Sequence, residues 1–389
     1  MKNFQFMETD FYQIAMVYAF IMDNKANTKS GYEGFIRRVK VETNPFQDFY
    51  VFKGNEEVVT YINTIKQELK DPELKDAFIE FLKPKIAYEG WENEFSEKFD
   101  ALDLSFEYNI VQDNSIIFPF VPVFQYRGPK WIGQMIETPI TNIYNGRTGL
   151  NTLKYLKENK DVYMTNNDLE YLESIVENIG NRFYDRYVED ITQRAIEYKN
   201  AFVDGIILEA AFRRAPSKSI STIASRKAIE VAGWAGTSNT TIYNEKNASK
   251  IGGTMAHAFV MSYDKEITAF KVWDKYFPNS TILIDTYDTI NAVYLLIENN
   301  IKPHDVRIDS GDFYEIVPKV RKILDENGWH DVGIFISGDI TPEMLTKMSY
   351  KLKFTKAMAG THYVYCNELV KKVNTGFVYK IVEYEDEKG

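Results

Sequence analysis

Short apolar runs, each followed by a small polar loop, recur through the second half of the chain. Each run has the length of a buried strand, and a stretch with helical periodicity usually separates it from the next. Seven such runs end near the following residues: Leu208, Val231, Ile251, Ile284, Ile308, Ile336 and Ala357. Alternating strands and helices predict a parallel sheet, and about seven units favour a closed or nearly closed α/β barrel over an open sheet.

The first 130 residues mix helical and strand periodicities. Thr9 or Asp10 is placed to cap a first helix whose apolar side begins at Phe11. The pattern also predicts these elements: strands over residues 31–39 and 49–54, and helices over 56–69 and 78–82. Residues 111–117 are expected to form a hairpin that turns near Asp113.

The proline-rich stretch that ends at Pro129 marks a domain boundary, because proline restricts the chain to extended or turn conformations. We expect an N-terminal α+β domain over residues 1–130 and an α/β barrel domain over residues 131–364. Residues 376–384 alternate like a strand, so the segment 365–389 is expected to rejoin the first domain and to end in a few frayed residues.

Two long stretches between the boundary and the repeating units have helical periodicity. They cover residues 134–159 and residues 169–187. The first contains a short segment with two glycines, residues 146–149, and we expect a kink or a break there.

Composition and charge narrow the class of protein. The chain has 389 residues, of which 44% are apolar and 26% are charged, as in ordinary globular proteins with room for two domains. A formal net charge of -10 argues against nucleic-acid and anionic-membrane partners. The single cysteine, Cys366, excludes an internal disulfide and is expected to be a small buried side chain. No apolar run could span a bilayer and residues 1–6 lack a signal-peptide pattern, so a cytoplasmic protein is expected.

The loops after the predicted strands carry histidine and carboxylates. His257 follows small and flexible residues, so its ring can face an open pocket, and a neutral imidazole is a competent nucleophile toward phosphorus. Asp309 and Asp312 flank a tight loop and could bind ribose hydroxyls or Mg²⁺, and Asp285 and Asp288 form a similar pair. The alternatives are a structural histidine and carboxylates that only cap turns.

Arginines and late glycine loops could bind the anionic parts of a substrate. Arg213 and Arg214 follow a predicted strand and can form a phosphate clamp, although adjacent arginines are often solvated surface charge. Arg307 lies within an apolar strand and must pair with a carboxylate, of the protein or of a substrate. Gly338 and the Gly360–Thr361 segment lie after the last two predicted strands, where barrels often bind phosphate through backbone amides.

Taken in order along the chain, these motifs resemble the nicotinate phosphoribosyltransferase family, which are type II phosphoribosyltransferases. The resemblance runs from Thr9 to about Tyr384. It rests on these segments: residues 9–13, 52–58, 137–139, 212–215, 236–239, 253–257, 285–289 and 307–312.

The resemblance implies an irregular α/β barrel joined to an N-terminal sheet-containing domain, in a homodimer whose second subunit completes each active site. It implies that nicotinate and phosphoribosyl pyrophosphate react to give nicotinate mononucleotide and pyrophosphate, in NAD salvage. Mg²⁺ is the implied cofactor and ATP the implied co-substrate, with ATP hydrolysis coupled through phosphorylation of His257.

The resemblance also implies roles for individual residues. Tyr12 matches the tyrosine that stacks on the pyridine ring, either within one subunit or across the dimer, and Arg307 matches an arginine near the nicotinate carboxylate. Arg213 and Arg214 match a phosphate-binding pair. Asp285 and Asp309 are the implied catalytic carboxylates at the ribose. Asp309 and Asp312 are the implied ligands of Mg²⁺. The other implied substrate-binding residues are Thr237, Ser238, Gly338, Gly360 and Thr361.

One departure from the family pattern leaves alternatives open. The family usually carries a second glycine in the late phosphate loop, whereas this chain has Met358, which could narrow the loop or shift the phosphate. Met358 is the reason to consider a catalytically silent ligand-binding homologue. A nicotinamide phosphoribosyltransferase and an unrelated barrel enzyme that acts on sugar phosphates are further alternatives. Arg307 favours nicotinate, because a neutral amide gains less from a guanidinium group.

Overall fold

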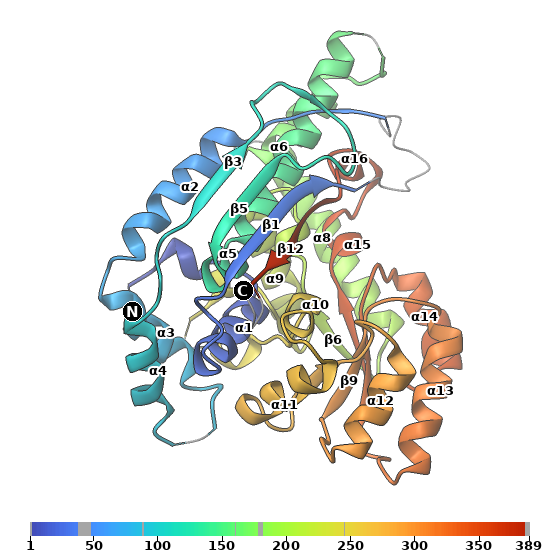
Figure 1. The fold of residues 1–389 in the computed structure, drawn as a ribbon. Coiled ribbons are helices and arrows are strands. Elements are labelled where there is room, and N and C mark those ends of the chain that lie inside the picture. The colour runs from blue at the N-terminus through green and yellow to red at the C-terminus, as the bar shows by residue number, and fades with distance from the viewer. Residues whose placement is uncertain are drawn as a thin grey trace.

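The protein contains an antiparallel sheet and a parallel sheet that lie side by side (Figure 1). The computed structural model describes residues 2–37, 48–87, 89–159, 161–177, 182–244 and 246–385. The two sheets correspond to the expected α+β and α/β parts of the chain.

The antiparallel sheet has four strands in the order β12-β1-β5-β3. Their bounds are Lys29–Ile36 (β1), Glu107–Ile110 (β3), Phe124–Pro129 (β5) and Phe377–Tyr384 (β12). β12 pairs with β1, and Gly34 lies opposite Tyr379, which confirms that the end of the chain returns to the first sheet. Of the strand expected over 31–39, residues 38 and 39 lie outside the described part, as do residues 386–389 of the segment expected to fray.

Helices α5 (Lys130–Met135) and α6 (Glu137–Glu158) pack on one face of this sheet. Along β5, buried and exposed residues alternate, as expected for a sheet with one covered face. Tyrosines fill the covered face, where the rings of Tyr32 and Tyr379 stack with 5.0 Å between their centroids. The C-terminal end of β12 lies close to the parallel half of the molecule (Figure 1).

The hairpin expected over residues 111–117 does not form. A turn is present at Asp113, but β4 (Ile116–Ile117) pairs with the distant β2 (Tyr50–Val51), and β3 pairs with β5. The Asp113 carboxylate accepts hydrogen bonds from the backbone N–H groups of Gly54 and Asn55, at 3.1 and 3.2 Å, where α2 (Asn55–Glu68) begins. The turn thus caps a helix instead of closing a hairpin.

Helix α1 (Phe11–Met22) is buried at every position except Tyr12. Asp10 occupies the N-cap position, as expected, but its carboxylate does not cap the helix. It accepts hydrogen bonds from the hydroxyls of Ser238 and Thr138, the second at 2.8 Å. The helix start is therefore tied to the parallel half of the molecule.

The parallel sheet has six strands, in the order β7-β6-β11-β10-β9-β8. Their bounds are Ile206–Glu209 (β6), Gly236–Thr237 (β7), Thr281–Leu283 (β8), Asp305–Ile308 (β9), Gly333–Ile336 (β10) and Lys356–Ala359 (β11). Five of the seven predicted strands are confirmed. The strand predicted to end at Val231 is wrong, because residues Lys227–Val231 form a π-helical turn (η3) after α9 (Lys218–Arg226).

The strand predicted to end at Ile251 is also wrong, and the sheet is a six-stranded half-barrel. Ile251 makes only an isolated bridge to Thr237, on the edge strand β7. The segment that follows spans the gap between the two edges of the sheet: the Gly252 N–H donates to the Thr237 carbonyl at 2.9 Å, and the Thr254 hydroxyl donates to the Thr281 carbonyl at 2.7 Å. An extended loop therefore takes the place of a seventh strand.

The glycines of α6 do not break the helix, contrary to expectation. A Cβ atom on Gly146 would lie 1.9 Å from the Pro216 carbonyl oxygen, and one on Gly149 would lie 2.1 Å from the Val373 carbonyl oxygen. The glycines therefore let two other backbone segments approach α6 closely. One of these segments directly follows Arg214, so this contact helps to place the candidate arginine pair.

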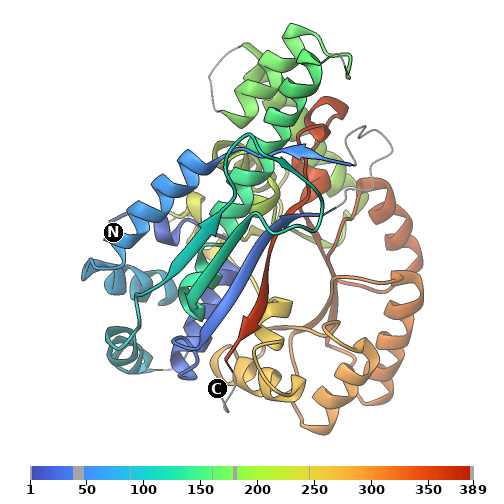
Figure 2. The same cartoon turned by 45° about the horizontal axis from the view of Figure 1, so that its top comes forward.

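The bounds of the remaining long helices are Glu73–Leu82 (α3), Trp91–Asp100 (α4), Asn166–Val176 (α7), Arg182–Ala201 (α8), Glu266–Tyr276 (α11), Thr289–Glu298 (α12), Phe313–Glu326 (α13) and Pro342–Lys351 (α14). Of these helices, α3 and α4 lie beside α1, α7 packs on α6 and α8, and α8 and α11–α14 lie around the parallel sheet (Figures 1 and 2). Of the helix expected over 169–187, residues 178–181 lie outside the described part. Within the described ranges, no helix combines the length and apolarity that crossing a bilayer requires.

Candidate active site at the ends of the parallel strands

Three loops at the carboxyl ends of β8, β9 and β10 are joined by hydrogen bonds. The Ser337 hydroxyl donates to Asp309 Oδ1 at 2.5 Å. Asp285 Oδ2 accepts from the Asp309 N–H at 2.9 Å and from the Ser310 hydroxyl at 2.7 Å. As expected for parallel strands, the functional groups of successive loops meet at one edge of the sheet.

His257 lies at the start of the short helix α10 (His257–Val260) and faces the same loops. Its Nδ1 atom is 3.1 Å from the Thr286 hydroxyl, and its Nε2 atom is 3.9 Å from Asp309 Oδ2. His257 and Asp309 are both half-buried. The structure therefore brings the predicted imidazole and the predicted carboxylate to one site.

Asp309 is held in its ionised form. Burial raises the pKa of this carboxyl group, but the contact with His257, the positive charge of Arg307 and the Ser337 hydroxyl together lower the pKa well below its usual range. The Asp285 carboxylate beside it has one buried oxygen, Oδ1, with no hydrogen-bond partner among the described residues. These carboxylates can therefore accept further hydrogen bonds or bind a cation.

The second aspartate of each pair caps a helix. Asp288 Oδ1 accepts from the Asn291 N–H at 2.7 Å at the start of α12, and Asp312 Oδ1 accepts from the Tyr314 N–H at 2.8 Å at the start of α13. For these two residues the turn-capping interpretation applies. A role of Asp312 at a metal ion stays a prediction.

Arg307 lies on β9 and is only 8% exposed. Burial lowers the pKa of its guanidinium group, whereas the nearby charges of Asp309 and Asp285 raise it. Arg307 forms no ion pair with another described residue, and its Nε atom is buried without a hydrogen-bond partner among them. Arg307 therefore lies near protein carboxylates without forming the expected ion pair among the described residues. Its guanidinium group can bind an anion.

Arg213 and Arg214 lie on a short 3₁₀ turn, Phe212–Arg214 (η2), that packs against α6. The side-chain amide of Asn142 donates to the Phe212 carbonyl at 3.0 Å, and that of Asn145 donates to the Arg214 carbonyl at 2.9 Å. These two amides fix the backbone of the turn, so the arginine side chains start from a defined position.

The two arginine side chains have different partners. Arg213 Nη1 is 3.3 Å from Glu137 Oε1, and its guanidinium group lies over the ring of Tyr12, 5.8 Å from the centroid. Arg214 Nη1 donates to the Phe377 carbonyl at 3.0 Å. Burial and the charge of Arg213 lower the pKa of Arg214 to about 10, so both side chains are cationic at neutral pH. Tyr12 and Arg213 meet within a single chain.

Thr237 and Ser238 are buried and bound to carboxylates of the protein. The Thr237 hydroxyl donates to Glu209, and the Ser238 hydroxyl donates to Asp10. Burial raises the pKa of Glu209 to about 7. These hydroxyls join β6, β7 and the start of α1, and their predicted contact with a substrate stays a prediction.

The late glycines lie beside the other loops. Gly338 has a φ of 114°, and a Cβ atom there would lie 2.7 Å from the Asp309 carbonyl oxygen, so the position needs glycine. Gly360 precedes the short helix that Thr361 begins. Met358 lies on β11 instead of in the loop, and it lines a cavity inside the curled sheet together with Leu208. Whether it narrows the loop after β11 or shifts a phosphate stays a prediction.

Sequence reasoning missed two residues of the site, Arg37 and Lys380, and it gave no role to Glu137, although Glu137 lies in the 137–139 segment of the resemblance. Lys380 on β12 and Arg37, directly after β1, are close enough to Arg213 and Arg214 for their charges to interact. Lys380 is exposed at the surface, but partial desolvation of its ammonium group and the neighbouring arginines lower its pKa. No local signal marks Arg37 and Lys380, because the pairing of the last strand with the first places them.

The arrangement fits a magnesium ion that a substrate carries. The described residues contain no cluster of three or more histidine, cysteine, aspartate or glutamate side chains for a metal held by protein alone. Mg²⁺ is usually held by one or two carboxylates together with substrate phosphates. The ionised Asp309 and the unpartnered oxygen of Asp285 are suitable ligands of this kind.

Comparison with known proteins finds similarity to nicotinate phosphoribosyltransferases. Residues 7–145 match the model of the nicotinate phosphoribosyltransferase N-terminal domain. Two relatives named nicotinate phosphoribosyltransferase, from Bacillus subtilis (strain 168) and Caenorhabditis elegans, are 25% and 26% identical over 98% and 96% of the chain. The matches cover 67% and 68% of those two relatives, so the chain spans about two thirds of their length.

Solved structures share the fold over nearly the whole chain. The crystal structure of nicotinate phosphoribosyltransferase from Porphyromonas gingivalis superposes with a TM-score of 0.64 at 15% identity, over 98% of this chain and 90% of that one. A putative nicotinate phosphoribosyltransferase from Saccharomyces cerevisiae gives 0.66 at 17% identity, over 98% and 91%. Together with the sequence matches, these similarities show that the chain resembles nicotinate phosphoribosyltransferases in its N-terminal domain, in its sequence at 25–26% identity and in its fold.

Proposed function

We propose that the protein is a nicotinate phosphoribosyltransferase that joins nicotinate to phosphoribosyl pyrophosphate, with nicotinate mononucleotide and pyrophosphate as products. One observation carries the proposal. An imidazole, two carboxylates and three arginines converge at the ends of the parallel strands. This set suits a substrate that has a ribose, several phosphates and a carboxylated base.

In this proposal the base lies between Tyr12 and Arg307. Arg307 is buried and has no ion-pair partner among the described residues, so a substrate carboxylate would satisfy it. The ring of Tyr12 would stack on the pyridine. A nicotinamide phosphoribosyltransferase is the alternative, and its neutral substrate would give the buried guanidinium group no ion-pair partner.

The phosphates would bind to the cationic groups and the glycine loops. Arg213 and Arg214 are the primary partners, with Arg37 and Lys380 beside them. Backbone N–H groups at Gly338, Gly360 and Thr361 would add hydrogen bonds, and Thr237 and Ser238 would hold the adjoining loops in place. Together these groups would offset the charge of the departing pyrophosphate.

Asp285 and Asp309 would act at the ribose. Departure of pyrophosphate leaves an electron-poor ribosyl carbon, and ionised carboxylates nearby lower the energy of that state. Asp309 and Asp285 would also hold Mg²⁺ on the substrate, with Asp312 as a further candidate. When bound, Mg²⁺ would neutralise charge on the leaving pyrophosphate.

His257 would accept a phosphoryl group from ATP. Asp309 lies on its Nε2 side and Thr286 on its Nδ1 side, so both ring nitrogens have an orienting neighbour. We further propose a homodimer whose second subunit completes each site, with the N-terminal domain ending near residue 130. Within one chain Tyr12 already contacts Arg213, so the partner would add to a largely formed base site.

A steady-state assay with purified protein tests the proposal. Nicotinate, phosphoribosyl pyrophosphate and Mg²⁺ should give nicotinate mononucleotide, faster with ATP than without it, and nicotinamide should react much more slowly. Faster turnover of nicotinamide would favour the alternative substrate. Binding of both substrates without release of pyrophosphate would favour a catalytically silent homologue.

A further inference from the structure

We infer that Glu137 is a positioning residue that orients Arg213 and Tyr12 together and so couples the phosphate and base subsites. Glu137 is the first residue of α6 and is 8% exposed. A carboxylate so deeply buried needs compensating donors. This inference rests on the proposed function, because it assigns Arg213 and Tyr12 to the two substrates.

Donors from three elements converge on the Glu137 carboxylate. Oε1 is 3.3 Å from Arg213 Nη1. Oε2 accepts from the Tyr12 hydroxyl at 3.4 Å, from Gln134 Nε2 at 3.4 Å and from the Gln13 side-chain amide. One oxygen therefore faces the phosphate-binding arginine and the other faces the tyrosine proposed for the base.

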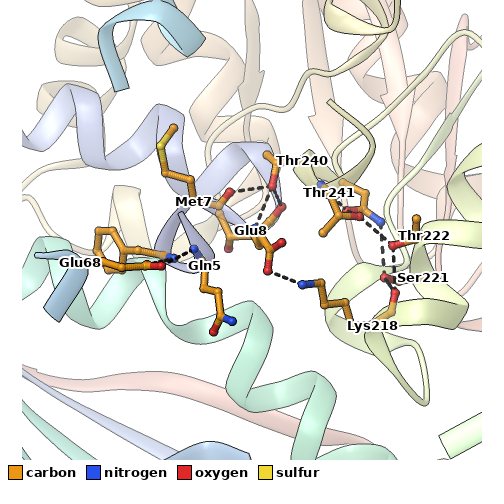
Figure 3. Close-up of polar contacts among 12 residues, drawn as sticks. Gln5, Met7, Glu8, Glu68, Lys218, Ser221, Thr222, Thr240 and Thr241 are labelled. Carbon is orange, nitrogen blue, oxygen red and sulfur yellow. Dashed lines mark hydrogen bonds and ion pairs between the residues drawn. The ribbon is translucent and has the colours of Figure 1, made fainter. Parts of the chain in front are cut away.

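The backbones that carry these side chains are fixed by other contacts. Asn142 and Asn145 hold the carbonyl groups of η2, as described above. The segment before α1 is held by the Thr240 hydroxyl, which donates to the Met7 carbonyl at 2.8 Å, and by an ion pair between Glu8 and Lys218 (Figure 3). Loss of the Glu137 charge should therefore disturb side-chain orientation more than the fold.

Arg214 offers an internal comparison. Its guanidinium group is held by the Phe377 carbonyl, a fixed backbone group, and not by a carboxylate. Arg213, in contrast, shares its carboxylate with Tyr12. A phosphate that binds Arg213 would fix the orientation of the Glu137 carboxylate, and the carboxylate would in turn fix the orientation of the Tyr12 hydroxyl. Binding at one subsite should then favour binding at the other, which is a reciprocal coupling between the two ligands.

The test uses isothermal titration of the full chain with pyrophosphate and nicotinate as probes. In the wild type, saturating pyrophosphate should tighten nicotinate binding by about 5-fold or more, the lower end of common coupling factors. In Glu137→Gln, pyrophosphate should bind about 10-fold more weakly, as expected for loss of a charged hydrogen bond, and the coupling factor should fall toward about 1.

The direction of the change separates positioning from simple electrostatics. If Glu137 acted only through its charge, its removal would strengthen the binding of an anion. Tighter binding of pyrophosphate by Glu137→Gln would therefore overturn the inference, and so would unchanged coupling. Glu57→Gln is the matched control, because it also removes a carboxylate that pairs with an arginine. Glu57 lies on α2, 2.6 Å from Arg147 of α6, and its replacement should leave both affinities unchanged.

A second variant covers the case in which Glu137→Gln fails to fold. Tyr12→Phe keeps the ring and removes the hydroxyl that contacts Glu137, so it should also lower the coupling factor. Coupling equal to that of the wild type in Tyr12→Phe would count against the shared carboxylate. If the wild type binds neither probe, the proposed function fails together with this inference. If it binds both and the variants match it, only the inference fails.

Discussion

The two aspartate pairs show how the same local motif can serve two purposes. In each pair the first residue, Asp285 or Asp309, faces the meeting point of the loops, and the second, Asp288 or Asp312, caps the next helix. The functional and the structural interpretations of such a pair therefore do not exclude each other. The two residues differ in their hydrogen-bond partners, which are groups of neighbouring loops for the first and helix N–H groups for the second, and the spacing alone does not reveal this difference.

At the residue scale, His257→Ala should abolish stimulation by ATP while leaving slow transfer without ATP. The imidazole would carry the phosphoryl group but would not contact the bond that forms between base and ribose. Initial rates of nicotinate mononucleotide formation with and without ATP measure the effect. His330→Ala is the control, because His330 is exposed and, within the described ranges, its ion pair is with Asp325. Equal ATP stimulation in His257→Ala and the wild type would refute the role.

Replacement of Arg307 should change the preference for the base. Arg307→Gln removes the buried cation, so the KM for nicotinate should rise by about 10- to 100-fold, as for loss of a charged hydrogen bond. The KM for nicotinamide, which lacks the carboxylate, should rise much less. An equal rise in KM for both bases would mean that Arg307 does not bind the nicotinate carboxylate.

At the element scale, the strands that were predicted correctly are those with continuous apolar runs. β8, β9 and β10 end at or within one residue of the predicted positions. The errors have a physical cause. The run that ends at Val231 is short enough to be a buried helical turn, and short apolar runs do not distinguish the two. The hairpin prediction was wrong because strand pairing is non-local: β4 pairs with residues more than 60 positions earlier in the chain.

Close approach of backbones explains the glycines of α6 and can be measured. Gly146→Ala places a methyl group against the Pro216 carbonyl, so the free energy of unfolding should fall by about 1–3 kcal/mol, the usual cost of overpacking. Gly252→Ala is the control, because a Cβ atom there meets nothing within 4 Å. Denaturant titration of both variants compares them. Equal stability of the two would contradict the packing account.

Glu209 should make the junction of β6 and β7 sensitive to pH. Burial raises its pKa from 4.5 to about 7, so between these values the folded state holds a proton that the unfolded state has lost. The contribution of Glu209 to the free energy of unfolding should therefore be greatest below about pH 4.5. It should fall by up to about 3 kcal/mol as the pH rises toward 7. Glu209→Gln should reduce this slope. A slope unchanged by the substitution would show that Glu209 is not responsible.

At the scale of the whole molecule, the candidate site combines segments from almost the entire chain. The loops after the parallel strands could be predicted from the sequence, because parallel strands place their carboxyl ends together. Tyr12 was assigned from resemblance. The segment of Glu137 was noted from resemblance, but its contacts and the contributions of Arg37 and Lys380 could not be predicted, because they depend on how the antiparallel sheet and α6 lie against the half-barrel.

A structure of the protein with nicotinate mononucleotide and pyrophosphate bound tests the account most directly. It should place the pyridine carboxylate at Arg307, the ribose at Asp309 and the phosphates at Arg213 and Arg214, with His257 facing the same cavity. A product bound elsewhere, or bound without contact to Asp309 and Arg213, would contradict the claim that the strand ends form a single phosphoribosyl site.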